Sequence, residues 1–167
     1  GLEHGIGEWN AESEDEIARI GAAAASRGAV ARVSLRVNPD IDPRSHPYIS
    51  TGLREAKFGG DISKAVEILR RARGRAGVEI VGLQCHIGSQ VTTVEPYVQA
   101  LERTVALAQR LRADAPALRY VDMGGGFGIW YRDAAAPEIA AYAKAMVPVL
   151  RGTGYRLILE PGRVIVG

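Results

Sequence analysis

A run of glycines offers the clearest chemistry in this sequence. Asp122-Met-Gly-Gly-Gly-Phe-Gly128 follows a strand-like segment, and successive glycines let backbone N–H groups approach an anion closely, as phosphate-binding loops require. The spacing is not that of a dinucleotide-binding G-x-G-x-x-G loop, because Ile129 occupies the last position, and no Gly-Lys-Ser/Thr follows. The run therefore predicts either a phosphate-binding loop made by Gly124, Gly125 and Gly126 or a tight turn that needs positive φ.

A histidine and a serine lie just past another apolar, strand-like segment, in His86-Ile-Gly-Ser-Gln90. The imidazole of His86 could stack on a flat ligand or transfer protons, and the Ser89 hydroxyl could donate to a phosphate oxygen. The plainer alternative is a core histidine beside a turn serine. A metal site is not expected, because Cys85 and His86 are adjacent, point to opposite faces of a strand and have no partner cluster.

Glu160-Pro-Gly-Arg163 ends a further strand-like segment. A carboxylate at the end of a buried strand is costly unless it is paired. Pro161 and Gly162 fix the turn, and the guanidinium of Arg163 suits a phosphate or a carboxylate. Either Glu160 and Arg163 pair with each other, or both face a ligand on the rim that carries the glycines and the histidine.

Strand-like and helix-like segments alternate along the chain and must position these groups. Apolar spacing predicts helices over residues 11–26, with Ser13 as a cap, 61–73, with Asp61 as a cap, 94–113 and 137–150. Alternation and β-branched residues predict strands over residues 30–37, 78–86, 119–123 and 156–160, and residues 164–167 also look like an apolar strand. A polar, proline-containing stretch over residues 38–60 predicts a long functional loop.

This alternation is typical of an α/β fold with a parallel sheet. The sheet is either open and doubly wound or part of a (β/α)8 barrel, and in both folds ligands collect at the carboxyl ends of the strands. The glycines, the histidine and the Glu-Pro-Gly-Arg turn all follow strands, so we expect them on one rim. A complete barrel typically needs about 250 residues, so the chain would supply only part of one.

Composition and charge exclude several classes of protein. Of the 167 residues, 47% are hydrophobic and 24% charged, which indicates a globular domain. The formal net charge of +2 is too dilute to favour a nucleic-acid partner, and no basic run has interleaved aromatic residues. No apolar run approaches the roughly 20 residues of a membrane span, so a membrane partner is not expected. The single cysteine excludes an internal disulfide and favours a cytoplasmic location.

Seven short motifs run in order along nearly the whole chain. They are Asn10-Ala-Glu-Ser13, Arg36-Val-Asn-Pro39, His46-Pro-Tyr-Ile-Ser-Thr-Gly52, Lys57-Phe-Gly59, Cys85-His-Ile-Gly-Ser-Gln90, Asp122-Met-Gly-Gly-Gly126 and Glu160-Pro-Gly-Arg163. Together they resemble the fold-type III decarboxylases that depend on pyridoxal 5′-phosphate (PLP), the family of ornithine, lysine, arginine and diaminopimelate decarboxylases. The third and fourth motifs point to the diaminopimelate branch. The resemblance implies a PLP-binding TIM barrel of the alanine racemase-like type and the decarboxylation of meso-2,6-diaminopimelate to L-lysine and CO2.

The resemblance also implies how the motif residues bind the cofactor. The PLP phosphate would rest on the amides of the three successive glycines, Gly124, Gly125 and Gly126, with help from Ser89. His86 would stack against the pyridine ring.

The last motif would serve the other end of the cofactor. Glu160 would face the pyridine nitrogen and keep it protonated, so that the ring takes up the electrons left at Cα when CO2 departs. Gly162 would belong to the same cofactor-binding turn. Arg163 would hold either the phosphate or a substrate carboxylate.

No catalytic residue is expected in this chain. The Schiff-base lysine of the family lies in a Tyr-x-x-Lys-Ala setting that does not appear here. Lys57 belongs to the Lys-Phe-Gly motif, and Lys64 and Lys144 fall in outer helices. Cys85 precedes the histidine motif and is not the cysteine acid of the family's carboxy-terminal β domain. We therefore expect roughly strands 4 to 8 of the barrel, without the early strands and the β domain, and no activity of the isolated chain.

Two other functions compete with this interpretation. One is a related decarboxylase of ornithine, arginine or a carboxylated polyamine precursor, and the other is a PLP-binding regulator that is not an enzyme. A phosphate-binding barrel fragment unrelated to PLP would need seven motifs to match in order by chance. As a full-length protein, a member of this family is expected to be a homodimer that acts on a small amino-acid substrate.

Overall fold

Parallel strands alternate with helices along the chain. The structure, a computed structural model, describes residues 1–41, 60–130 and 136–167. The strands are β1 (Trp9–Ala11), β2 (Ala31–Asn38), β3 (Gly60–Asp61), β4 (Val78–Gln84), β5 (Tyr120–Asp122) and β6 (Arg156–Ile158). The helices are the 3-10 turn η1 (Leu2–His4) and α1 (Glu14–Ala25), α2 (Ile62–Ala72), α3 (Glu95–Arg110), α4 (Ile139–Leu150) and α5 (Arg163–Val166).

The four predicted helices and four predicted strands are confirmed, with shifted ends. The first helix begins at Glu14 rather than at residue 11, because Ser13 is its N-cap and accepts a 3.2 Å hydrogen bond from the Glu16 N–H. Residues 9–11 instead pair with β2 as the short strand β1, which the sequence did not reveal.

Two further differences concern short elements. Residues 164–167 were predicted as a strand, which is wrong: α5 occupies Arg163–Val166, and the Gly167 N–H bonds to the Arg163 carbonyl at 2.7 Å. The two-residue strand β3 pairs with β2 and was not predicted. The motifs His46–Gly52 and Lys57–Gly59 lie outside the described residues.

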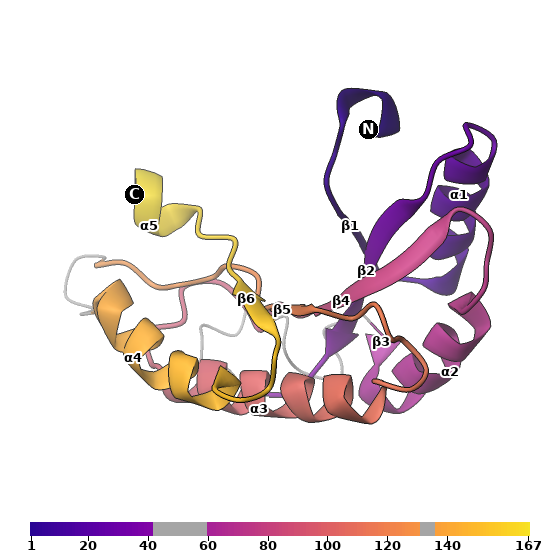
Figure 1. Cartoon of the computed structure of the whole chain (residues 1–167). Helices are drawn as coiled ribbons and strands as arrows, with labels where there is room; N and C mark the ends of the chain where they lie inside the picture. The colour runs from indigo at the N-terminus through magenta and orange to yellow at the C-terminus, as the bar shows by residue number, and fades with distance from the viewer. Residues whose placement is uncertain (42–59, 131–135) are drawn as a thin grey trace.

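The sheet has the order β1-β2-β4-β5-β6, with β3 beside β2, and every pair is parallel. Helices α1 to α4 lie along one side of this sheet (Figure 1). A doubly wound sheet carries helices on both faces, so the described part of the chain follows the barrel alternative.

The sheet is strongly curved. Strands β1 and β6 are at its opposite edges, and in a flat sheet four strand spacings would separate them by roughly 19 Å. Yet Asn10 Nδ2 of β1 donates to Glu160 Oε1, two residues beyond β6, over 3.1 Å. The strands therefore curl toward each other, as they do around a barrel, and their concave side brings distant strand ends together.

The apolar core lies between the convex side of the sheet and the helices. Along β2, Val33, Leu35 and Val37 are buried, and α3 contributes a stripe that includes Leu101 and Val105. Burial of each large aliphatic side chain contributes about 1.5–3 kcal/mol to the free energy of unfolding. In the described ranges, none of the helices is both long and apolar enough to cross a membrane.

Candidate functional site

The glycine loop after β5 is closely packed against two neighbouring loops. A Cβ atom on Gly125 would lie 2.3 Å from the Glu160 carbonyl oxygen, and one on Gly126 would lie 1.9 Å from the Gly88 carbonyl oxygen. Gly124 and Gly126 also have positive φ values of 64° and 91°. Larger residues do not fit, so these glycines serve both the turn and the close approach of the three loops.

The backbone N–H groups of the loop have different partners. The Gly124 N–H donates to Asp122 Oδ1 at 2.8 Å, a bond within the loop itself. Across residues 1–41, 60–130 and 136–167, no acceptor is recorded for the N–H groups of Gly125 and Gly126. Two of the three glycine amides therefore have no protein acceptor within these ranges.

Three buried aromatic rings support the loop from the core. Tyr97 of α3 donates to the Gly125 carbonyl at 2.8 Å and stacks on Phe127 with 4.6 Å between ring centroids. Tyr142 of α4 packs edge-on against both rings and donates to the Val91 carbonyl at 2.9 Å. The aromatic cluster fixes the loop because both phenols hold backbone carbonyls on neighbouring segments. The roles of Tyr97 and Tyr142 were not predicted, because in the sequence both look like ordinary helix core.

Ser89 and Arg163 come together at the rim, as we expected for residues that follow strands of one parallel sheet. Arg163 Nη2 donates to Ser89 Oγ over 3.3 Å, although 74 positions separate the two residues. Ser89 is half-buried and Arg163 is exposed. The guanidinium and the hydroxyl thus lie on the same side as the glycine loop, where both can reach an anion.

Glu160 differs from expectation in its burial. It is exposed rather than at the end of a buried strand, because β6 is an edge strand of the described sheet. Among the described residues, no ion pair joins Glu160 to Arg163, so that alternative is not what the structure contains. Glu160 accepts instead from Asn10, while its backbone N–H donates to the Gly124 carbonyl at 2.9 Å.

Asp122 is a buried carboxyl group at the centre of the rim, 3% exposed. Its burial, together with the nearby Glu160 carboxylate, raises its pKa from 3.8 to about 7, against the opposing effect of the Gly124 and Asn10 hydrogen bonds. Asn10 Nδ2 lies 3.5 Å from Asp122 Oδ2. Asp122 opens the glycine motif, but no role was predicted for it. Its carboxyl group just before the glycines is the feature of the sequence that could have indicated one.

His86 and Cys85 follow β4 and differ sharply in environment. Burial, followed by the positive charge of Arg36, lowers the pKa of His86, and the Glu160 charge opposes this shift in part. His86 is therefore mostly neutral near pH 7 and suited to stacking. Burial raises the pKa of Cys85 to about 12, and Thr104 and Met123 surround its sulfur, so this thiol belongs to the core.

The donors on the rim fit a phosphorylated, flat cofactor. Ser89, Arg163 and the two glycine amides that lack an acceptor among the described residues are suited to a phosphate. His86 and Glu160 offer an aromatic face and a carboxylate. On the concave side, the buried Gln84 Oε1 also has no hydrogen-bond partner among the described residues, which marks a polar floor. Within the same part of the chain no group of three His, Cys, Asp or Glu side chains is arranged to hold a metal.

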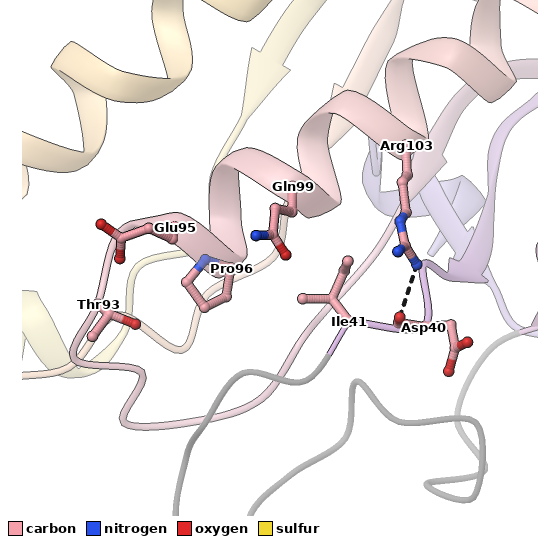
Figure 2. Close-up of a pocket in the computed structure, with 7 residues that line it drawn as sticks. All are labelled: Asp40, Ile41, Thr93, Glu95, Pro96, Gln99 and Arg103. Atoms are coloured by element: carbon pink, nitrogen blue, oxygen red, sulfur yellow. Dashed lines mark hydrogen bonds between the residues drawn. The ribbon is translucent and has the colours of Figure 1, made fainter.

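A separate pocket of about 390 Å³ lies between the start of α3 and the chain after β2 (Figure 2). Arg103 reaches across it and donates to the Pro39 and Asp40 carbonyls at 2.7 and 2.8 Å. None of the rim residues lines this pocket, so it is distinct from the candidate site.

Neither of the two lysines in the described ranges contributes to the rim. Lys64 on α2 and Lys144 on α4 are exposed on outer helices, as predicted. Lys57 lies outside the described residues.

Comparison with known proteins agrees with the resemblance seen in the motifs. Residues 1–167 match the family described as pyridoxal-dependent decarboxylase, pyridoxal binding domain. Diaminopimelate decarboxylase of Pseudomonas fluorescens is 48% identical over 166 residues, which cover 99% of this chain and 40% of that protein. The enzyme of the same name from Neisseria meningitidis serogroup A is 46% identical over 166 residues, with 99% and 41% coverage.

A solved structure of diaminopimelate decarboxylase from Helicobacter pylori, complexed with L-lysine, superposes with a TM-score of 0.92. It is 40% identical and matches 99% of this chain and 42% of its own. The chain thus spans about 40% of the length of the curated relatives it matches. From the match along its whole length, the chain belongs to the family of pyridoxal-dependent decarboxylases, whose pyridoxal-binding domain it resembles throughout.

Proposed function

We propose that this chain is the cofactor-binding part of a diaminopimelate decarboxylase, which converts meso-2,6-diaminopimelate to L-lysine and CO2. The observation that carries the proposal is the Arg163–Ser89 hydrogen bond on the rim of the glycine loop, where the Gly125 and Gly126 amides have no acceptor among the described residues. It gathers phosphate-binding groups from three strand ends on one rim. The 46–48% identity to two diaminopimelate decarboxylases supports the choice of substrate.

In this proposal the phosphate lies against the Gly125 and Gly126 amides, with Ser89 and Arg163 at its side. The Gly124 N–H already donates to Asp122, so Gly124 shapes the turn and does not bind the phosphate through its N–H. Gly162 belongs to the same turn, as the N-cap residue of α5 directly before Arg163.

His86 and Glu160 would hold the pyridine ring of the cofactor. When bound, PLP supplies a protonated ring that accepts the electron pair left at Cα as CO2 departs. Glu160 holds the proton on the ring nitrogen by hydrogen bonding and charge, and the neutral imidazole of His86 covers one face of the ring. Arg163, with its donors spread over a planar fork, can serve the phosphate and a substrate carboxylate alike.

The proposal also covers the place of this chain in the whole protein. We infer that the chain corresponds to roughly strands 4 to 8 of the barrel and that the described lysines do not anchor the cofactor. The decarboxylase would be a cytoplasmic homodimer that binds an amino-acid substrate.

A PLP titration of the chain tests the cofactor site. Trp130 lies two residues past the loop glycine Gly128 and is 69% exposed, so its fluorescence should report binding at the rim. We expect saturable quenching without a covalent lysine adduct that borohydride can trap. Trp130→Phe is the matched control, because it leaves Trp9 as the sole indole and should abolish the signal. Absence of quenching, or a specific trapped lysine among the described residues, would overturn the proposed site.

A chimera tests the substrate. The region of the Pseudomonas fluorescens enzyme that this chain matches would be replaced by residues 1–167, and CO2 release would be measured with several amino acids. We expect activity on meso-2,6-diaminopimelate and none on ornithine or arginine. A chimera that binds PLP but releases CO2 preferentially from ornithine or arginine would contradict the proposal, and one that binds PLP without any activity would favour a regulator.

A further inference from the structure

Three polar side chains, from β1, β5 and the turn after β6, meet on the concave side of the sheet. The Asn10 amide group stands between two carboxyl groups, with Nδ2 3.1 Å from Glu160 Oε1 and 3.5 Å from Asp122 Oδ2. Because an amide NH2 has two hydrogens, Asn10 can donate to both at once. Strand β1 thereby connects the strand ends of β5 and β6.

Ser34 fixes the direction of this amide. Its hydroxyl donates to Asn10 Oδ1, so the NH2 group must face the carboxyl groups. Ser34 is completely buried, whereas Asn10 is exposed, so the anchor is rigid and the bridge lies at the surface of the concave side. Nothing in the packing of Asn10 requires an amide here, because an exposed position accepts many side chains.

Asp122 connects the bridge to the glycine loop. One of its oxygens faces Asn10 and the other accepts the Gly124 N–H at 2.8 Å. Asp122 and Glu160 influence each other directly, which favours a proton on the buried partner. The other titratable or charged groups around the pair are His86, Cys85, Tyr120 and Arg36.

We propose that Asn10 and Asp122 are positioning residues for the cofactor, which join Glu160 to the glycine loop in one hydrogen-bonded cluster. The cluster orients the Glu160 carboxylate for the pyridine nitrogen and couples that end of the site to the phosphate end through Gly124. This inference rests on the proposed function in placing the pyridine nitrogen beside Glu160, but the cluster itself can be tested without cofactor.

The first experiment titrates the carboxyl groups of the cofactor-free chain by NMR with carbon-13 in Asp and Glu side chains. Asp122 should titrate near pH 7 in the unchanged chain. Glu160→Gln should lower its midpoint by one pH unit or more, and Asn10→Ala should raise it, because a donor to the ionised form is lost. Asp114→Asn, which removes an outer partner of Arg70, should leave the midpoint unchanged. An Asp122 midpoint that Glu160→Gln and Asn10→Ala leave unmoved would overturn the inference.

The second experiment compares PLP with an analogue that has carbon in place of the ring nitrogen. We expect the unchanged chain to prefer PLP by about tenfold, the size of one charge-assisted hydrogen bond. Asn10→Ala and Glu160→Gln should both bring this ratio toward one, whereas Ser89→Ala should weaken both ligands equally. Asn10→Gln, which keeps a donor, should restore part of the preference.

These experiments distinguish a failure of the proposed function from a failure of the positioning role of Asn10. If the unchanged chain binds neither ligand, the proposed function fails and the carboxyl titration alone decides on the cluster. If it binds PLP and Asn10→Ala keeps the full preference for the ring nitrogen, the proposed function survives and the positioning role of Asn10 is wrong.

Discussion

Arg163 Nη2 lies 3.3 Å from Ser89 Oγ and donates a hydrogen bond to it, which joins the first residue of α5 to the loop after β4. Strand β5 separates the strands that precede these two residues. The bond therefore joins the turns that follow β4 and β6, on either side of β5, and brings a cation and a hydroxyl together at the rim. A phosphate bound there would replace a weak, solvent-exposed contact with several charge-assisted bonds.

Substitution of either residue should weaken PLP binding. We expect Arg163→Met to reduce affinity by about tenfold or more and Ser89→Ala by about threefold to tenfold, because each removes a direct donor to the phosphate. Isothermal calorimetry measures both. Pyridoxal, which lacks the phosphate, should bind the variants and the unchanged chain alike.

Arg112→Met is the matched control for Arg163→Met. Arg112 is an exposed arginine just after α3, at the opposite end of the sheet from the rim. Equal losses of PLP affinity in the two variants would mean that Arg163 acts through overall charge rather than through contact.

Gly126→Ala should damage the loop through steric conflict. Its Cβ would meet the Gly88 carbonyl oxygen at 1.9 Å, and the residue has a φ of 91°. We expect the free energy of unfolding to fall by about 3 kcal/mol or more, as overpacking and left-handed strain add. Gly28→Ala is the control, because it has a φ of 64° with no atom within 4 Å and should cost only about 1 kcal/mol. Equal losses in urea unfolding would contradict the close packing of the loop.

Much of the fold followed from local patterns in the sequence. The buried alternation of β2 and the apolar stripe of α3 have periods that single out a strand and a helix, and both elements are present. Strand β1 was missed because three residues are too few to show a period, and it exists only through pairing with β2. The apolar end of the chain was misassigned because Val164, Ile165 and Val166 favour a strand by type, whereas α5 is set by the turn at Gly162.

Part of the candidate site could also be predicted from local patterns in the sequence. Glycines and charged residues after strands identify a rim, so Ser89 and Arg163 could be expected near each other. The bridge by Asn10 could not be predicted, since it depends on how strongly the sheet curls between its two edges. The support from Tyr97 was hidden too, because a tyrosine on an apolar helix face looks the same whether or not its hydroxyl holds a loop carbonyl.

Tyr97→Phe should destabilise the protein through one lost hydrogen bond. The change would leave the buried Gly125 carbonyl without its donor, at a cost of about 1–3 kcal/mol. Phosphate affinity should fall as well, because the loop loses a fixed point. Tyr155→Phe provides the contrast: the Tyr155 hydroxyl is buried with no hydrogen-bond partner among the described residues, so its removal should be neutral or stabilising. Thermal unfolding compares the stability of the two variants. If Tyr97→Phe is at least as stable as Tyr155→Phe, Tyr97 does not support the loop.

Asp122 should make the stability of the protein depend on pH. Because its pKa is about 7 in the folded chain and 3.8 in the unfolded chain, the folded form binds the extra proton between these values. The stabilisation is complete below about pH 4 and is lost as the pH rises through 7. Asp122→Asn mimics the protonated state, so it should remove this decline and raise the free energy of unfolding at pH 8 by up to about 4 kcal/mol, the equivalent of three pH units. Urea unfolding at pH 4, 6 and 8 measures the effect. If the free energy of unfolding of Asp122→Asn falls with pH as much as that of the unchanged chain, the ionisation of Asp122 does not destabilise the fold.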